Sequence, residues 1–268
     1  MADQKEYALI TGAGKGLGKA FATELAQRNI NVLLTALPGE NLSGFCEKLS
    51  SDHNIISDFI ECDLTKEKEI QRLVEWVKEH FPLNILINNA GIGGTAEFEK
   101  ADKTLIDNII LLNVRTTALL THQLLPVLKK NRPAWVLNVA SMASLSPIGY
   151  KTVYPASKAF VVNFSRGLSQ ELKHSGVFVS VVYPGPMTTH FDSLRRIKKQ
   201  GALGKMCVLS AQYTAHKTID RLFKKNTHIL VGLGNKLNWF LTKIIPVGLR
   251  LPIITRIIKR EIKTSETV

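Results

Sequence analysis

Short apolar runs rich in β-branched residues alternate along this chain with longer segments whose apolar residues recur at helical spacing. In the segment 66–80, for example, Leu73, Val74 and Val77 share one face of a helix. Strict alternation of strands and helices predicts right-handed βαβ crossovers and a parallel sheet with helices on both faces. The predicted strands are Tyr7–Thr11, Asn31–Ala36, Ile55–Glu61, Ile85–Asn88, Ala134–Ala140, Val177–Tyr183 and His228–Val231. The predicted helices are Leu17–Arg28, Leu42–Leu49, Lys66–His80, Leu105–Leu128, Tyr154–His174, Asn235–Ile245 and Arg250–Lys263.

The pattern predicts one doubly wound α/β domain over residues 1–268, with about seven parallel strands. A hydrophobic content of 45% and a charged content of 21% are ordinary for globular proteins and exclude wholesale disorder, coiled coils and collagen-like repeats. The three cysteines lie far apart and near no histidine cluster, so we expect neither a disulfide framework nor a metal site. Residues 1–10 carry acidic side chains and no long apolar run. No apolar stretch reaches the ~20 residues of a membrane span, and we predict a cytoplasmic protein.

Residues 11–18, TGAGKGLG, separate the first predicted strand from the first predicted helix. The N-terminus of a helix carries free N–H groups and a partial positive charge, which attract phosphate. Side chains beyond Cα would block the approach of a phosphate to the backbone, which explains why glycine recurs here. A tight turn that binds no ligand is the alternative interpretation of such a loop. The position between strand and helix favours a dinucleotide phosphate.

The spacing of Gly12, Gly16 and Gly18 resembles that of the short-chain dehydrogenase/reductase family. The resemblance extends over roughly residues 5–190, in the family's order. The matching motifs are Asn88-Asn89-Ala90-Gly91 after the fourth strand, Asn113 in a helix, Ser141 after the fifth strand, Tyr154 and Lys158 as YxxxK, and Pro184-Gly185 after the sixth strand. The resemblance implies a Rossmann-like fold and transfer of a hydride to or from NAD(P)(H). It also implies a substrate lid at about 187–215.

Tyr154 and Lys158 are four residues apart, which places both on one face of a helix. Free tyrosine has a pKa of about 10, and a nearby ammonium favours the tyrosinate, so we expect the pKa of Tyr154 to be lowered. Ser141 follows a strand whose carboxyl end faces the ligand side of the sheet, where its hydroxyl can donate to a substrate oxygen. An isolated YxxxK spacing would equally describe a surface helix. The glycine loop and Ser141 favour catalysis.

The resemblance implies a role for each of four candidate catalytic residues. Tyr154 would be the general acid/base and Ser141 would stabilise the substrate oxygen. Lys158 would also bind the ribose of the nicotinamide, and Asn113 would position a water. The candidate cofactor-binding residues are Gly12, Gly14, Lys15, Gly16, Leu17, Gly18, Asp63, Leu64, Asn89, Ala90, Gly91, Tyr154, Lys158, Pro184, Gly185, Met187 and Thr188. Asp63 has a second interpretation, as the N-cap of the helix that follows.

The second strand ends at Ala36, and Leu37 stands where an NAD-specific site usually has an acidic residue. Such a carboxylate would repel the 2′-phosphate of NADP, so its absence permits NADP. Lys15 resembles the basic residue that NADP-preferring family members place against this phosphate. The second basic residue that many of them carry is missing at Leu37-Pro38. We predict NADP, with NAD as the alternative.

The net charge of +13 is concentrated near the C-terminus, because residues 191–268 hold 16 Lys and Arg against 4 Asp and Glu. In the predicted helix 250–263, isoleucines fill one half and basic residues cluster on the other. This pattern is typical of a helix that lies on an anionic membrane surface. The alternative for the basic, amphipathic extension 232–268 is packing over the substrate pocket or against another subunit. Pro246 and Pro252 exclude one continuous helix over this extension. No motif supports nucleic-acid binding.

The predicted function is NADPH-dependent interconversion of an apolar ketone and a secondary alcohol, small molecules that would bind beside the cofactor. One alternative is a 3-oxoacyl carrier-protein reductase, whose acidic partner a basic surface would suit. Another is a regulatory or scaffold protein that binds NADP without turnover. The resemblance also implies a homodimer or homotetramer packed through the helices 105–128 and 154–174.

Overall fold

The computed structural model describes residues 6–187 and 207–265, the last six of these as backbone only. Its strands are β1 (Tyr7–Thr11), β2 (Asn31–Ala36), β3 (Ser57–Glu61), β4 (Leu83–Asn88), β5 (Ala134–Val139), β6 (Val177–Val182) and β7 (His228–Ile229). Its helices are α1 (Gly16–Ala26), α2 (Leu42–His53), α3 (Glu67–His80), α4 (Lys103–Ile110), α5 (Thr117–Lys130), α6 (Val153–Glu171), α9 (Ala211–Phe223), α10 (Leu233–Ile244) and α11 (Val247–Ser265). Two 3₁₀ turns, η1 (Phe98–Lys100) and η3 (Met142–Leu145), and a π-helical turn, η2 (Leu111–Thr116), complete the described elements.

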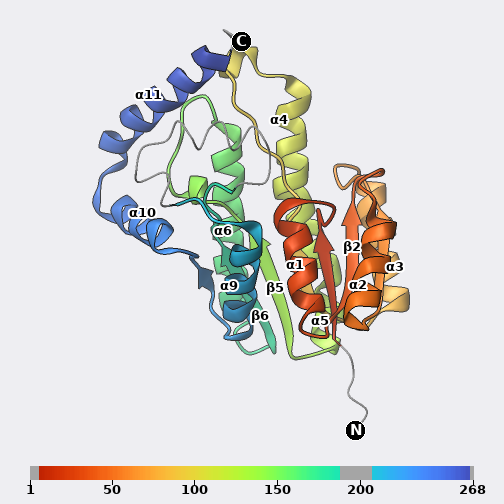
Figure 1. Cartoon of the computed structure of the whole chain (residues 1–268). Coiled ribbons are helices and arrows are strands. Elements are labelled where there is room, and N and C mark those ends of the chain that lie inside the picture. Colours follow the sequence, from red (N-terminus) through yellow and green to blue (C-terminus); the bar gives the residue numbers. More distant parts are fainter. Residues whose placement is uncertain (1–5, 188–206, 266–268) are drawn as a thin grey trace.

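The seven described strands form one parallel sheet in the order β3-β2-β1-β4-β5-β6-β7, which confirms the predicted doubly wound α/β fold (Figure 1). In the central strands, alternate residues are buried on opposite faces of the sheet. In β1, Ala8 and Ile10 pack with α1, α2 and α9, whereas Leu9 packs with α3 and α5. Because helices cover both faces of the sheet, the central strands are continuous apolar runs in the sequence.

The strand order reverses beside β1, because the chain moves outward through β2 and β3 and then returns to β4 on the other side. The carboxyl ends of β1 and β4 therefore diverge into loops that leave opposite sides of the sheet. A crevice at such a reversal is where ligands bind in open α/β sheets.

Three segments differ from the sequence prediction. The long helix expected over 105–128 consists of α4, the π-helical turn η2 and α5. The helix α9 was not predicted, and it packs against α1. It includes residues 211–215 of the predicted lid, so this part belongs to the body of the protein, while residues 188–206 lie outside the described residues.

Helices α10 and α11 extend beyond the β7 edge of the sheet (Figure 1). The predicted break at Pro246 is confirmed, since α10 ends at Ile244 and α11 begins at Val247. Pro252 lies inside α11 and does not interrupt it. The carbonyl that Pro252 leaves without an N–H belongs to the exposed Gly248, where water can satisfy it. None of the described helices combines the length and the apolar character that crossing a bilayer requires.

Candidate active site

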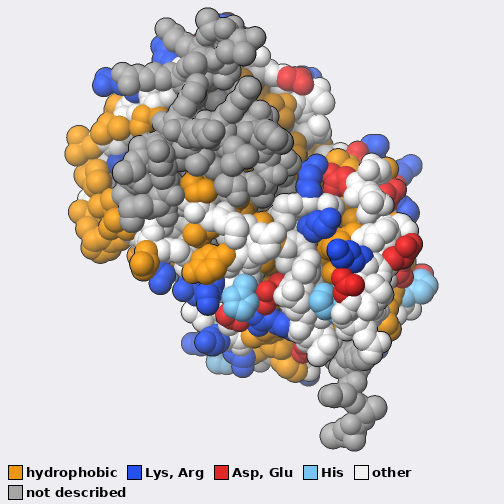
Figure 2. All heavy atoms as spheres, in the orientation of Figure 1, with side chains coloured by type: hydrophobic (Ala, Val, Ile, Leu, Met, Phe, Trp, Pro, Cys, Tyr) orange, Lys and Arg blue, Asp and Glu red, His pale blue; other side chains and the backbone are white. Residues whose placement is uncertain are grey.

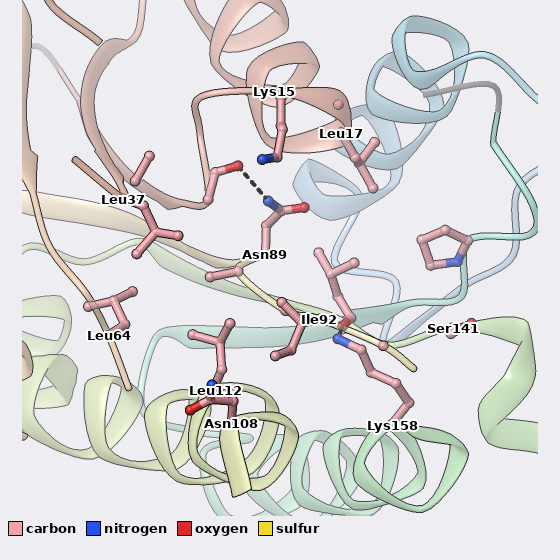
Figure 3. Close-up of a pocket in the computed structure, with 18 of the residues that line it drawn as sticks. Lys15, Leu17, Leu37, Leu64, Asn89, Ile92, Asn108, Leu112, Ser141 and Lys158 are labelled. Atoms are coloured by element: carbon pink, nitrogen blue, oxygen red, sulfur yellow. Dashed lines mark hydrogen bonds between the residues drawn. The ribbon is translucent and has the colours of Figure 1, made fainter. Parts of the chain in front are cut away.

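A cavity of about 760 Å³ lies at the carboxyl ends of β1, β4, β5 and β6. Figure 3 shows its two ends: Leu37 and Leu64 lie on one side, and Ser141 and Lys158 on the other. The predicted site residues that line it are Gly12, Lys15, Gly16, Leu17, Asp63, Leu64, Asn89, Ala90, Gly91, Ser141, Tyr154, Lys158, Pro184, Gly185 and Met187. Thr188 lies outside the described residues. The structure thus brings most of the predicted residues to one cavity.

The glycine loop turns into α1 with two positive φ angles, +64° at Gly12 and +57° at Gly16. The first turn of a helix leaves N–H groups without intrahelical partners. At α1 the N-cap residue, Lys15, makes no side-chain hydrogen bond to them. An uncapped helix N-terminus that faces a cavity is suited to bind an anion.

The loop is attached to β4 through Thr11 and Asn89. The Asn89 side-chain amide donates to the carbonyl oxygen of Thr11 at 2.8 Å and to that of Gly12 at 3.1 Å, the latter being the dashed line in Figure 3. In return, the Thr11 hydroxyl oxygen accepts from the backbone N–H groups of Asn89 and Ala90, each at 2.9 Å. These bonds position the loop relative to the neighbouring strand.

Two predicted cofactor contacts, Gly14 and Gly18, are not among the residues that line the cavity. A Cβ on Gly18 would lie 2.1 Å from the carbonyl oxygen of Gly12, so this glycine permits close packing of α1 on the loop. A Cβ on Gly14 would lie 2.2 Å from a carboxylate oxygen of Glu40. Both glycines therefore make room for protein atoms.

The end of the cavity near β2 holds an ion pair that sequence analysis missed. Lys15 Nζ lies 2.6 Å from Glu40 Oε1, and both residues line the cavity beside Ala36 and Leu37. Glu40 reaches the glycine loop because Gly39, at a φ of +85°, turns the chain back after β2. The sequence signal for this turn was the Pro38-Gly39 pair, since such pairs are typical of turns.

Asp63 lines the cavity and accepts hydrogen bonds from the Thr65 backbone N–H at 3.1 Å and from the Thr65 hydroxyl at 2.7 Å. Burial raises the pKa of this carboxyl, but the hydrogen bonds from Thr65 and Lys66 outweigh it and lower the pKa overall. The N-cap position of α3 belongs to Lys66, so the alternative prediction of Asp63 as N-cap is wrong. Asp63 instead stabilises the turn that precedes the helix.

At the other end of the cavity, Ser141 follows β5, and Tyr154 and Lys158 lie one turn apart on α6. The Ser141 hydroxyl oxygen accepts from the backbone N–H of Ala143 at 3.1 Å and is hydrogen-bonded to Tyr154. Lys158 is buried, and its Nζ donates to the Val139 carbonyl oxygen at 2.8 Å. Burial lowers the pKa of Lys158 to about 8.

The expected lowering of the Tyr154 pKa is wrong for the protein alone. Burial raises the pKa of this phenol, and the hydrogen bond with Ser141 offsets only part of the rise. Lys158 is directed to the Val139 carbonyl, and the burial that lowers its own pKa reduces the charge it carries above pH 8. Desolvation thus outweighs the attraction between the two groups.

Asn113 is fully buried behind the wall of the cavity, within the π-helical turn. Its side-chain amide donates to the Ile92 carbonyl oxygen at 2.9 Å and to Ser157 Oγ at 2.9 Å, and its Oδ1 accepts from the Ile92 N–H at 3.0 Å. A Cβ on Gly91 would lie 2.9 Å from Asn113 Oδ1 and 3.0 Å from Lys158 Nζ. Asn113 therefore holds the loop after β4 against α6.

A family model for short chain dehydrogenases matches residues 6–200. The chain belongs to the short-chain dehydrogenase family. This short-chain dehydrogenase is 31% identical to the very-long-chain 3-oxoacyl-CoA reductase of Anas platyrhynchos, over 71% of this chain and 62% of that protein. It is 30% identical to hydroxysteroid dehydrogenase-like protein 1 of Gallus gallus, over 71% of this chain and 58% of that protein. The chain thus spans about three fifths of the length of these two curated relatives.

Among solved structures, this short-chain dehydrogenase is similar to the RhlG/NADP active-site complex of Pseudomonas aeruginosa. The two chains are 30% identical and superpose with a TM-score of 0.65, over 73% of this chain and 77% of the other.

Proposed function

We propose that this short-chain dehydrogenase is an NADPH-dependent oxidoreductase that interconverts an apolar ketone and a secondary alcohol. The observation that carries the proposal is that one cavity joins an uncapped helix N-terminus to Ser141, Tyr154 and Lys158. A phosphate site at one end and a proton-transferring group at the other match the two needs of hydride transfer to a carbonyl.

The residues of the cavity fit a nicotinamide dinucleotide. The N–H groups at the start of α1 would bind the diphosphate, and Asp63 and Leu64 would contact the adenine. Lys158, Pro184, Gly185 and Met187 line the half of the cavity that would take the nicotinamide. The bound nicotinamide supplies or accepts the hydride.

NADP is supported by the residues near the end of β2. No carboxylate follows directly on Ala36, and the ammonium of Lys15 lies at the cavity edge, where it can turn from Glu40 to a 2′-phosphate. The solved RhlG relative is described with NADP.

Proton transfer belongs to Tyr154. A raised pKa keeps its hydroxyl protonated near neutral pH, so it can give a proton to the oxygen of a carbonyl that has received a hydride. Ser141 is hydrogen-bonded to Tyr154 and can donate to the same oxygen. Lys158 lines the same cavity and adds positive charge to it while it is protonated.

An apolar substrate is supported by Ile92, Leu112 and Met187, which line the cavity. The two curated relatives are named for hydroxysteroids and for very-long-chain 3-oxoacyl-CoA. A 3-oxoacyl thioester is therefore the second candidate. Sequence analysis predicted a 3-oxoacyl group bound to an acidic carrier protein. That form of the substrate is supported only by the basic C-terminal region.

The test is NADPH oxidation, followed by absorbance, with a panel of apolar ketones and 3-oxoacyl thioesters. Tyr154→Phe should reduce kcat by at least about 100-fold, the size of a general-acid contribution. Its affinity for NADPH, measured by fluorescence, should stay within about threefold. Tyr150→Phe, a tyrosine on the loop before α6, is the matched control and should retain activity. If the wild-type protein binds NADPH and reduces nothing on the panel, it is a cofactor-binding regulatory or scaffold protein.

NADP selectivity has its own test. Lys15→Ala should raise the Kd for NADPH by about 10–100-fold, the strength of one charge-assisted hydrogen bond, and change the Kd for NADH much less. Glu40→Gln should lower the Kd for NADPH, because it releases the Lys15 ammonium. An equal loss for both cofactors in Lys15→Ala would contradict a contact with the 2′-phosphate.

A further inference from the structure

Large apolar side chains that are exposed to solvent gather on the C-terminal hairpin, which comprises α10, α11 as far as residue 259, and their connection (residues 233–259). Figure 2 shows them along one edge of the molecule, over the hairpin of Figure 1. Their exposed fractions run from 37% to 81%. They are Leu233, Leu237, Phe240, Ile244, Ile245, Val247, Leu249, Ile253 and Ile257.

These side chains form continuous rows. On α10 the exposed apolar residues are 233, 237, 240 and 244, a spacing of four, three and four that places them in one stripe. On α11 the exposed apolar residues 249, 253 and 257 recur every four positions. Ile245 and Val247 connect the two rows.

The opposite sides of both helices face the protein. Asn235 of α10 is buried and donates to the Val231 carbonyl oxygen at 2.9 Å. On α11, Ile258 is buried and Thr255 packs so closely on Gly149 that a Cβ there would lie 2.6 Å from it. The exposed rows therefore form an outer apolar face. The alternative prediction, that the extension packs over the protein, explains only the inner side of α11.

The hairpin is positively charged, and the remainder of α11 adds Arg260, Glu261 and Lys263. Residues 233–259 contain five basic residues and no acidic residue. The basic residues are Lys236, Lys243, Arg250, Arg256 and Lys259. Lys236 and Lys243 are exposed and lie seven residues apart, along one border of the α10 stripe. The ammonium of Lys243 lies 5.7 Å from the centre of the Trp239 ring.

The apolar rows and the positive charge together favour one of the partners that could cover the outer apolar face. A second copy of the chain would place five positive charges against five in a two-fold contact, which is repulsive. An anionic lipid surface offers phosphates to the basic border and acyl chains to the apolar stripe.

We propose that the α10–α11 hairpin docks this protein on the surface of an anionic lipid bilayer. The apolar rows enter the boundary between headgroups and acyl chains, and the Lys and Arg side chains contact lipid phosphates. The hairpin also adjoins the candidate active site, because α10 packs against η3 and α11 packs against Gly149. A docked protein therefore holds the segment 142–150, which follows Ser141, close to the lipid surface.

Co-sedimentation of the full-length protein with vesicles tests the proposal, and this readout is independent of enzyme activity. We expect the protein to pellet with vesicles of phosphatidylglycerol and phosphatidylcholine, and to bind pure phosphatidylcholine at least about 10-fold more weakly. High salt should weaken binding to the anionic vesicles. Replacing four exposed side chains, by Leu237→Ser, Phe240→Ser, Ile253→Ser and Ile257→Ser, should weaken it by at least about 100-fold.

Matched variants separate local contacts from general effects. Lys236→Glu with Lys243→Glu should weaken binding strongly. Lys48→Glu with Lys68→Glu makes the same change in net charge on exposed positions of α2 and α3, at the far edge of the sheet, and should weaken it little (Figure 1). Ile56→Ser removes an exposed apolar side chain elsewhere and should have no effect. Thermal melts and NADPH binding verify that each variant is folded.

Three outcomes would overturn the proposal. One is a wild-type protein that stays in the supernatant with anionic vesicles, and another is equal binding by the Lys48/Lys68 and Lys236/Lys243 variants. The third is a four-serine variant that pellets like wild type but has a smaller mass in solution, since a second copy would then be the partner that covers the face.

Discussion

Lys158 shows how burial sets the chemistry of a single side chain. The residue is 5% exposed, and its Nζ donates to the Val139 carbonyl oxygen, an uncharged acceptor. An uncharged acceptor compensates the loss of hydration only in part, and burial lowers the pKa from 10.5 to about 8. The residue is therefore poised to lose its charge in mildly alkaline solution.

This shift predicts a dependence of stability on pH. Between pH 8 and pH 10.5 the unfolded chain holds a proton on this amine that the folded protein has released, so stability rises with pH in this window. The whole effect amounts to about 3 kcal/mol at about 1.36 kcal/mol per pKa unit. We expect the free energy of unfolding of the wild type, relative to Lys158→Met, to rise by about that amount across the window. Urea denaturation at several pH values measures it.

The exposed Lys48, replaced by Met, is the control for the loss of one positive charge. A difference between wild type and Lys158→Met that is the same at every pH would contradict the lowered pKa of Lys158.

At the scale of elements, the contact between α1 and the glycine loop depends on Gly18. We expect Gly18→Ala to lower the free energy of unfolding by several kcal/mol and to weaken NADPH binding, because its Cβ would lie 2.1 Å from the Gly12 carbonyl oxygen. Overpacking usually costs about 1–3 kcal/mol, and a backbone carbonyl cannot move aside as a side chain can. Thermal melts and fluorescence titration with NADPH measure the two effects.

Gly248→Ala is the matched control. Gly248 also lies in a helix, nothing lies within 4 Å of a Cβ built on it, and alanine there should stabilise the protein by up to about 1 kcal/mol. If the two variants melt at the same temperature, close packing at Gly18 does not determine how α1 sits on the loop.

The elements that the sequence predicts well are those whose buried residues are large and apolar. The run of β2 is buried at every position, and the stripe of Ile70, Leu73, Val74 and Val77 on α3 is likewise buried. The missed helix α9 buries Ala211, Thr214, Ala215 and Thr218 along its length, and large apolar residues only at its end. Small and hydroxyl-bearing residues give no periodic hydrophobic signal, although they allow α9 to approach α1 closely.

The residues of the candidate site likewise fall into those that the sequence predicts and those that it does not. The motif residues could be predicted because each follows a recognisable strand or stands at helical spacing. Glu40 could not, since its place beside Lys15 depends on the turn at Gly39. Asn113 was expected at the site, but the π-helical turn that buries it behind the wall has no distinct sequence pattern.

At the scale of the whole molecule, we expect the predicted self-association to use one exposed face of α6. One exposed stripe of α6 consists of Ala156, Phe160, Asn163 and Gly167, spaced by four, three and four and uncharged, with the exposed Arg166 at its border. Phe160 stacks on Phe164 of the same helix, with ring centres 5.7 Å apart, and presents a flat apolar surface. An uncharged stripe with small residues at both ends lets two helices of identical copies approach closely around a two-fold axis.

We therefore expect the protein in solution to have the mass of a dimer or tetramer, and Phe160→Glu to reduce it toward that of one chain. A two-fold contact would place the two introduced carboxylates together, where they repel. Light scattering coupled to size-exclusion chromatography measures the mass. Ile56→Glu introduces the same charge at another exposed apolar position and should leave the mass unchanged. A Phe160→Glu variant with the wild-type mass would remove the α6 stripe from the interface.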